Sequence, residues 1–193
     1  MRSATFYFDV GSPYAYLAAE RINSVLPEPP LWQPILLGGL FKIHKRDSWA
    51  NGNGRAAGMA EVERRAAEYG LPPIRWPEPW PGNTLFAMRA ATFAMEAGKA
   101  VSFALAAFRQ GFAGGRDLSE PDNVLLAAAA CELHPKAVLK AVETTSIKNR
   151  LKQATEEAAE LGVVGVPSLA VGDRVFWGDD RLEEAATALG RRS

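Results

Sequence analysis

A β-strand that turns directly into a helix, near the start of the chain, constrains the fold more than any other stretch. Residues 5–10 read TFYFDV, an aromatic and β-branched run that favours a strand. Gly11 ends this run, Ser12 is a natural N-cap, and Pro13 suits the first position of a helix. Residues 14–21, YAYLAAER, then favour helix. Ser12 is therefore predicted to lie where a strand delivers the chain into a helix.

The predicted place of Ser12 suits an anion. The first N–H groups of a helix have no partner within the helix, and the helix dipole is positive at this end. Both features stabilise negative charge, including that of a thiolate. The alternative is that Ser12 is only an N-cap, and this stretch alone leaves both interpretations open.

Composition argues against several classes of function. The 193 residues are 48% hydrophobic, which is enough to bury a substantial core in one domain or in a domain with an insertion. Lys plus Arg and Asp plus Glu are equal at 22 each, so no net field favours nucleic acid or an anionic membrane. Cys131 is the single cysteine, which excludes an internal disulfide and a dithiol centre. His44 and His134 lie far apart without ligand spacing, so we expect no metal site.

The sequence also bears on location and assembly. No stretch nears membrane-spanning length, and residues 1–9 hold no apolar run long enough for a signal peptide. We therefore expect a cytoplasmic protein that binds neither nucleic acid nor membrane. We further expect a homodimer.

The pattern along the chain predicts β-α-β, then a block of helices, then α-β-β-α. The first helix covers about residues 13–25, and the second strand, 31–35, is expected to be parallel to the first because a helix intervenes. Residues 36–40 run into Gly38-Gly39, and beyond them Asn51-Gly52-Asn53-Gly54 indicates an irregular loop. The five prolines of 72–81 indicate an extended surface segment. The predicted later elements are helices at 56–69, 83–96, 100–111, 122–131, 135–142, 148–161 and 180–189, and strands at 167–171 and 174–177.

This order predicts an α/β fold in which both ends of the chain build one sheet domain. Residues 1–37 and 147–193 are assigned to that domain, and residues 38–146 to an all-helical domain inserted between them. Two motifs at opposite ends resemble the thioredoxin superfamily, namely SPYA at residues 12–15 and GVPS at 165–168, ahead of a strand. In that superfamily the first helix begins with C-x-x-C and faces a cis proline. The resemblance therefore implies a thioredoxin-like domain with a helical insertion.

Ser12 and Ala15 occupy the two cysteine positions of that motif. A dithiol oxidoreductase is therefore rejected, because these two side chains cannot form a disulfide. With FYFDVGSPYAYLA at 6–18, PILLG at 34–38 and GVVGVPSLAVGDRVFWGDDRLE at 162–183, the whole chain resembles the 2-hydroxychromene-2-carboxylate isomerase family. These proteins are relatives of the kappa-class glutathione transferases and of the periplasmic disulfide oxidoreductases.

The resemblance implies glutathione, or another low-molecular-weight thiol, as cofactor. Ser12 would contact its sulfur as the catalytic residue, since comparable settings lower a thiol pKa from about 8.5 to about 3.5–7.5. The Val166-Pro167 bond would be cis and leave Val166 able to pair with the cysteinyl part. The alternative is an ordinary trans proline at a strand start.

The start of the last helix is implied to hold the γ-glutamyl end of the thiol. Backbone N–H groups would take its carboxylate, and an aspartate its ammonium. The residues of this turn are Gly178, Asp179, Asp180 and Arg181. The alternative is that the aspartates only cap the helix and Arg181 is a solvated charge.

The loop after the second strand departs from the family pattern, since KRDSWANGNGRAAG at 45–58 replaces the usual G-N-x-P-P. Lys42 is placed to hold the substrate carboxylate and Trp49 to form a pocket wall. Either Asn51 or Asn53 would replace the family asparagine. The candidate substrate residues are Lys42, Trp49, Asn53 and Asn83, with Tyr14 and Tyr16 either lining the site or packing in the core.

The resemblance implies a glutathione-dependent isomerase of small aromatic molecules resembling 2-hydroxychromene-2-carboxylate. The thiolate would add reversibly to an electrophilic carbon, so that a double bond can rotate before elimination. One alternative is a kappa-class-like glutathione transferase or peroxidase, which consumes the thiol. Another is a non-catalytic thioredoxin-like protein that binds a partner through the cis-proline face.

Overall fold

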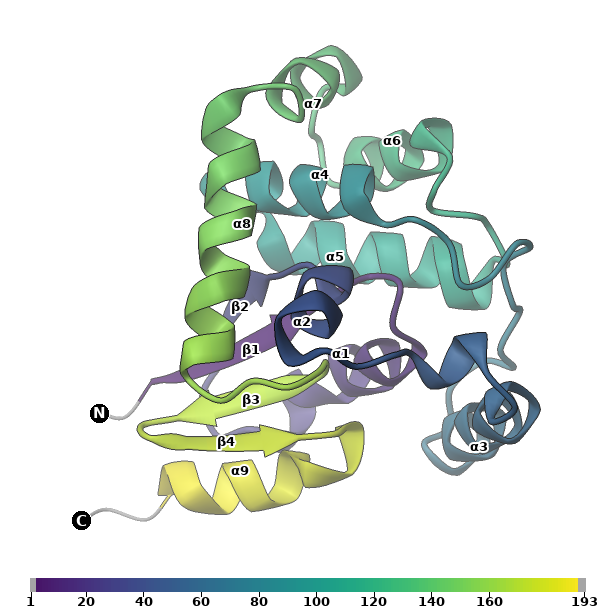
Figure 1. Ribbon diagram of the computed structural model, residues 1–193, viewed down its shortest axis with the longest axis vertical. Helices are drawn as coiled ribbons and strands as arrows, with labels where there is room; N and C mark the ends of the chain where they lie inside the picture. The colour runs from purple at the N-terminus through teal and green to yellow at the C-terminus, as the bar shows by residue number, and fades with distance from the viewer. Residues whose placement is uncertain (1–2, 191–193) are drawn as a thin grey trace.

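The computed structural model describes residues 3–190 and has a four-stranded sheet in the order β2-β1-β3-β4 (Figure 1). β1 (Ala4–Phe8) pairs in parallel with β2 (Leu31–Pro34) and antiparallel with β3 (Ser168–Val171), which pairs antiparallel with β4 (Arg174–Trp177). The two ends of the chain therefore meet in one sheet. This confirms the mixed α/β fold.

Helices follow the strands in an order close to the predicted one. α1 (Pro13–Val25) follows β1, and α9 (Leu182–Gly190) follows β4 through the short turn η3 (Asp179–Arg181). The segments between β2 and β3 are α2 (Leu37–His44), η1 (Trp49–Asn51), α3 (Arg55–Glu68), α4 (Leu85–Glu96), α5 (Ala100–Phe108), η2 (Arg109–Ala113), α6 (Pro121–Ala130), α7 (Pro135–Ala141) and α8 (Thr145–Glu160). Within the described residues, no helix combines the length and apolarity needed to cross a membrane.

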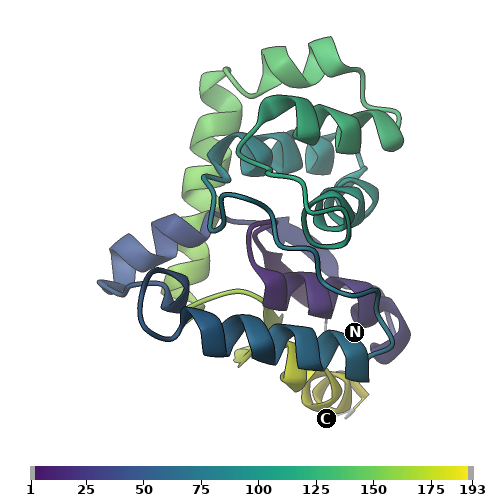
Figure 2. The ribbon, with the colours of Figure 1, turned by 90° about the vertical axis from the view of Figure 1, so that its right-hand side faces the viewer.

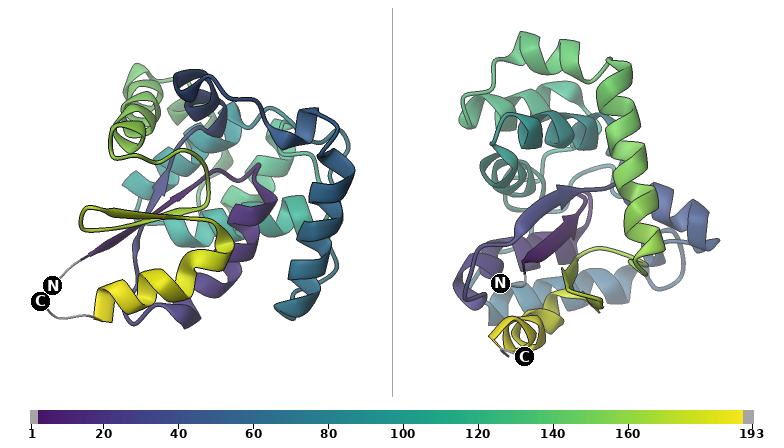
Figure 3. Two further views of the ribbon diagram at one scale, coloured as in Figure 1. Left: turned by 60° about the horizontal axis from the view of Figure 1, so that its bottom comes forward. Right: turned by 90° about the vertical axis from the view of Figure 1, so that its left-hand side faces the viewer.

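The helices cover the sheet on both faces. α1 contacts both α9 and α3, and the three helices lie side by side below the sheet (Figure 3). α4, α5 and α8 contact β2, while α6 and α7 lie beyond them at the other end of the molecule (Figures 1 and 2). The division at residues 37/38 and 146/147 stays a prediction.

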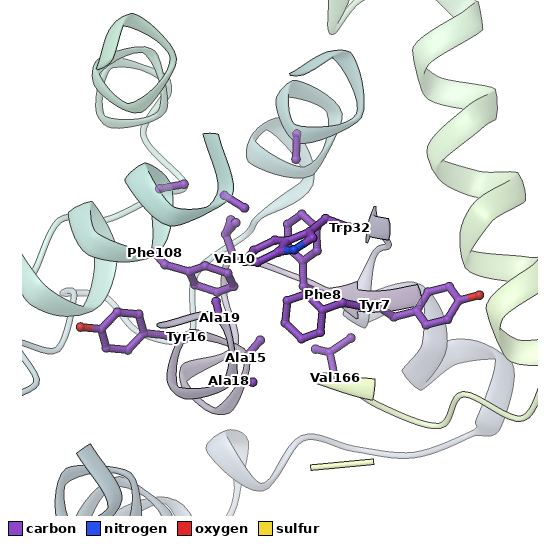
Figure 4. Packing of buried hydrophobic residues seen from close by; sticks show 14 of the residues in the cluster. Tyr7, Phe8, Val10, Ala15, Tyr16, Ala18, Ala19, Trp32, Phe108 and Val166 are labelled. Carbon is purple, nitrogen blue, oxygen red and sulfur yellow. The ribbon is translucent and has the colours of Figure 1, made fainter. Parts of the chain in front are cut away.

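The core begins with the aromatic residues of β1. Phe6 and Phe8 pack edge-on against Trp32 of β2, with ring centroids 4.8 and 5.7 Å apart, and all three side chains are buried. Phe108 of α5 lies 6.1 Å from Phe8 and joins the helices to the sheet (Figure 4). Tyr16 belongs to the same core, because it is 1% exposed, stacks on Phe112 of η2 and packs at a tilt against Phe108 of α5.

α2 spans Gly38-Gly39, a stretch for which the sequence predicts no helix. Its N-terminal amides find partners in distant segments, since Leu36 N donates to Thr155 Oγ1 and Leu37 N donates to Asp9 Oδ2. Gly39 also allows α8 to come close, because a Cβ there would meet Thr155 Cγ2 at 3.0 Å. Tertiary contacts thus stabilise this helix where local sequence does not.

Candidate functional site

A cavity of about 960 Å³ opens at the point where α1 begins. Its walls come from the β1–α1 turn, α2 and the loop behind it, η1, the start of α4, the segment before β3, and the end of β4 with η3. These segments come from both ends and the middle of the chain. Most of the site residues predicted from the sequence lie along these walls.

Ser12 is the N-cap of α1 and lies at the cavity with 4% of its surface exposed. Its Oγ accepts a hydrogen bond from Ala15 N at 3.2 Å and donates to the carbonyl oxygen of Val166 at 3.4 Å. The second bond is long for a hydroxyl donor. The hydroxyl therefore caps the helix through its lone pairs while its proton stays available to a better acceptor in the cavity.

The segment facing Ser12 has the expected backbone. The Val166-Pro167 bond is cis, and both residues line the cavity. Pro167 O accepts a hydrogen bond from Gly178 N at 2.9 Å, which fixes the end of β4 beside this segment. The helix start and the proline turn thus meet at Ser12 Oγ and Val166 O.

The two aspartates of η3 have different environments. Asp179 is 1% exposed, and its carboxylate receives Arg65 Nη1 at 2.8 Å and Tyr69 Oη at 2.9 Å. Burial raises the pKa of Asp179, and the hydrogen bond from Tyr69 and the charge of Arg65 oppose that rise. Asp180 also lines the cavity, but its side chain is 57% exposed and lies 3.8 Å from Arg65. Asp180 is thus the carboxylate of this turn that is open to a ligand.

Arg181 and Asn53 lie outside the cavity walls, although the sequence analysis predicts both as site residues. Arg181 pairs with Glu184 at 2.6 Å on the surface of α9. Asn53 is an exposed residue of the loop between η1 and α3, and Asn51 lines the cavity instead. The nominated residues that the structure brings together are Ser12, Lys42, Trp49, Asn83, Val166, Pro167, Gly178, Asp179 and Asp180.

One side of the cavity is aromatic. The ring of Trp49 lies 5.9 Å from that of Tyr14 and 5.4 Å from that of Trp80, and all three residues line the cavity. Trp80 is only 7% exposed, and its Nε1 donates to Gly11 O at 3.4 Å. The sequence missed Trp80, because the prolines of 72–81 indicate a surface segment. Such a wall can stack on a planar ring.

The floor of the cavity holds a buried carboxylate that the sequence treats only as the end of the first strand. Asp9 is 1% exposed, with Oδ1 accepting from Gly11 N at 2.9 Å and Oδ2 from Leu37 N at 2.8 Å and Thr84 Oγ1 at 3.2 Å. Burial raises the pKa of Asp9, and these three hydrogen bonds oppose the rise. Asp9 thereby joins three walls of the cavity at one point.

Comparison with known proteins agrees with this geometry. The family described as DSBA-like thioredoxin domain matches residues 4–190. This chain belongs to that family. A 2-hydroxychromene-2-carboxylate isomerase of Sphingobium xenophagum is 27% identical over 191 residues, which cover 94% of this chain and 95% of that protein. Glutathione S-transferase kappa 1 of Homo sapiens is 32% identical over 83 residues, 39% of this chain and 37% of that protein.

A solved structure supports the same fold. The structure of a 2-hydroxychromene-2-carboxylate isomerase superposes with a TM-score of 0.88 at 22% identity, over 97% of this chain and 94% of that chain. This DSBA-like thioredoxin domain nevertheless has no cysteine at the cavity. Cys131, the single cysteine of the sequence, is buried, and its Sγ contacts Ala127 O and Ala128 O of α6. Any sulfur chemistry at Ser12 therefore needs a thiol from outside the chain.

Proposed function

We propose that this protein is a glutathione-dependent isomerase of aromatic substrates that resemble 2-hydroxychromene-2-carboxylate. The observation that carries the proposal is the placement of the Ser12 hydroxyl at the N-terminus of α1, in contact with Val166 O where both residues line the cavity. The positive end of the helix dipole stabilises a thiolate, and so does a hydroxyl donor whose hydrogen bond to Val166 O is long. The full-length relationship to an isomerase supports the reaction class.

The residues around Ser12 fit a peptide thiol. Val166 offers backbone for pairing with the cysteinyl part, and the exposed carboxylate of Asp180 takes the ammonium of the γ-glutamyl part. The N–H groups of η3 take the γ-glutamyl carboxylate, while buried Asp179 holds Arg65 and Tyr69 in place. When bound, glutathione would supply a thiolate that adds reversibly to an electrophilic carbon of the substrate.

The aromatic side of the cavity serves the substrate. Tyr14, Trp49 and Trp80 provide flat surfaces for a planar ring and exclude water from it. Lys42 on α2 binds the substrate carboxylate, and Asn83 offers a polar contact at the start of α4. We further propose a cytoplasmic homodimer, and the lone cysteine is consistent with a reducing compartment.

The proposal is tested by calorimetric titration of the wild type and Ser12→Ala with glutathione, in two buffers of different ionisation enthalpy. The wild type should bind saturably and release protons, because the bound thiol is ionised. Ser12→Ala should bind more weakly or release fewer protons. No saturable heat with the wild type would remove glutathione from the proposal.

A kappa-class-like glutathione transferase is the second candidate, supported by the match to the human kappa protein. An isomerase returns the thiol unchanged, whereas a transferase consumes it. Free thiol is therefore counted during turnover with a generic aromatic electrophile. Stoichiometric loss would favour the transferase. A protein that binds no thiol at all would instead favour the non-catalytic alternative, in which the face around Val166 binds a partner.

A further inference from the structure

Charged side chains lie at opposite ends of the segment that precedes β3. Arg46 Nη1 donates to Val164 O at 3.1 Å, at the upstream end. Gly178 N donates to Pro167 O at 2.9 Å, which brings η3 and Asp180 to the downstream end. Val166, which faces Ser12, lies between them. The cavity thus presents the Arg46 guanidinium on one side of Ser12 and the Asp180 carboxylate on the other.

Arg46 is held in place without an acidic partner. Its guanidinium lies 5.0 Å from the ring centroid of Trp177, a residue that is 46% exposed at the cavity. Trp177 in turn lies against Gly165, because a Cβ at Gly165 would come within 2.7 Å of its Nε1. Within residues 3–190, no carboxylate lies within salt-bridge distance of Arg46. The guanidinium is therefore oriented by a carbonyl and an aromatic ring, with its charge uncompensated.

The remaining donors of Arg46 suit a carboxylate. A guanidinium has five N–H groups in a planar fork, and the bond to Val164 O takes one of them. The others can bind both oxygens of a carboxylate at once. Arg46 lines the cavity, so such a group can reach it from inside.

The positions of Arg46 and Asp180 determine in which direction a peptide thiol lies along the segment before β3. An extended ligand advances about 3.3 Å per residue, as a paired strand does. A ligand with its cysteine beside Val166 and its ammonium at Asp180 runs antiparallel to the protein segment. The residue after the cysteine then lies beside Gly165, and its carboxylate points toward the guanidinium bound to Val164 O.

We propose that Arg46 is a specificity-determining residue that binds the C-terminal carboxylate of the thiol, with Trp177 as its support. The thiol class is then a peptide in which one residue with a free carboxylate follows the cysteine. This inference rests on the proposed function. It adds that the thiol is recognised by an ammonium group at one end and a carboxylate at the other.

The test compares two ligands on three proteins by calorimetry. The ligands are glutathione and its glycyl amide, which has the same length but no C-terminal charge. The proteins are the wild type, Arg46→Gln and the control Lys45→Gln, which removes an equal charge at an exposed neighbour outside the cavity walls. Arg46→Gln should weaken glutathione binding roughly fivefold, because the pair stays partly solvated. Binding of the amide should be equal in all three proteins.

The outcomes separate the two proposals. If wild type binds the amide as tightly as glutathione, or Lys45→Gln weakens glutathione as much as Arg46→Gln does, the role of Arg46 is overturned and the proposed function stands. An equal loss for both ligands in Arg46→Gln would likewise reduce Arg46 to a structural residue. A wild type that binds neither ligand would overturn the proposed function together with this inference.

Discussion

The Ser12 hydroxyl and the carbonyl oxygen of Val166 are 3.4 Å apart, although 154 positions separate the two residues in the chain. One residue caps the helix that follows the first strand, and the other precedes the cis proline that leads into the third strand. A helix start is a favourable place for negative charge, and the extended backbone ahead of β3 can pair with a peptide. Their meeting point can therefore bind both the sulfur and the backbone of a small peptide thiol.

Replacing Ser12 by Ala should lower kcat/KM by at least about tenfold, because the thiolate loses its hydroxyl donor. The variant also loses the N-cap of α1, which costs about 1 kcal/mol of stability. Steady-state kinetics with a chromene carboxylate and chemical denaturation measure the two effects.

Thr144→Ala is the matched control for the cap. Thr144 Oγ1 accepts from Ile147 N at 3.3 Å at the start of α8, away from the cavity walls. This variant should lose a similar amount of stability and keep full activity. Equal activity losses in the two variants would mean that Ser12 acts only through stability.

Asp9→Asn should destabilise the protein more at pH 4 than at pH 7. Burial raises the folded-state pKa of Asp9 above its unfolded value of about 3.9. Between those two values the folded state binds the proton more tightly, so the wild type loses stability as pH rises through this window. The Asn variant lacks this pH dependence, because its amide does not titrate. The stability that it loses with the hydrogen bonds of the carboxylate is the same at every pH. Urea denaturation at several pH values measures the difference, with Asp173→Asn in the exposed β3–β4 turn as control. A penalty that grows with pH would contradict the raised pKa.

Tyr69 should resist ionisation well above the ordinary range for tyrosine. Burial, followed by the hydrogen bond to Asp179, raises the pKa of Tyr69 from 10.0 to about 12. Tyrosinate absorbance of wild type minus Tyr69→Phe, followed against pH, isolates this group. Asp179→Asn should lower its pKa, because the negative partner is gone. An unchanged value in that variant would assign the shift to burial alone.

The helices and strands that are predicted best are those whose propensity and capping residues lie next to each other in the sequence. Strand propensity, an N-cap and a proline at the first helical position agree over residues 5–25, and α1 has the predicted bounds Pro13–Val25. α2 has no such signal, since its N-cap, Leu36, has no side-chain hydrogen bond to offer. The amides that begin α2 are satisfied by Asp9 and Thr155, which only the folded chain brings near. Helices capped by distant residues are therefore missed.

The same distinction between local and distant signals explains which residues of the site could be predicted. Ser12 and the Val166-Pro167 turn stand in motifs, and both can be found from the sequence. Arg65 and Trp80 are missed because nothing beside them in the sequence indicates a site. Arg65 is one charge among several on α3, and it matters only through the 2.8 Å contact with Asp179. Residues that a site recruits from elsewhere in the fold need the structure to reveal them.

Two helical glycines should respond oppositely to alanine, because one of them supports the aromatic wall. At Gly38 on α2 an added Cβ would have no atom within 4 Å, so Gly38→Ala should stabilise the protein by about 0.5–1 kcal/mol through helix propensity. At Gly58 on α3 a Cβ would lie 2.3 Å from Trp49 Cζ3, so Gly58→Ala must displace the indole ring. That displacement should cancel the gain in stability and raise KM for an aromatic substrate, while glutathione binding stays unchanged. Denaturation and steady-state kinetics measure both, and equal stabilisation by the two variants would show that Trp49 is free to move.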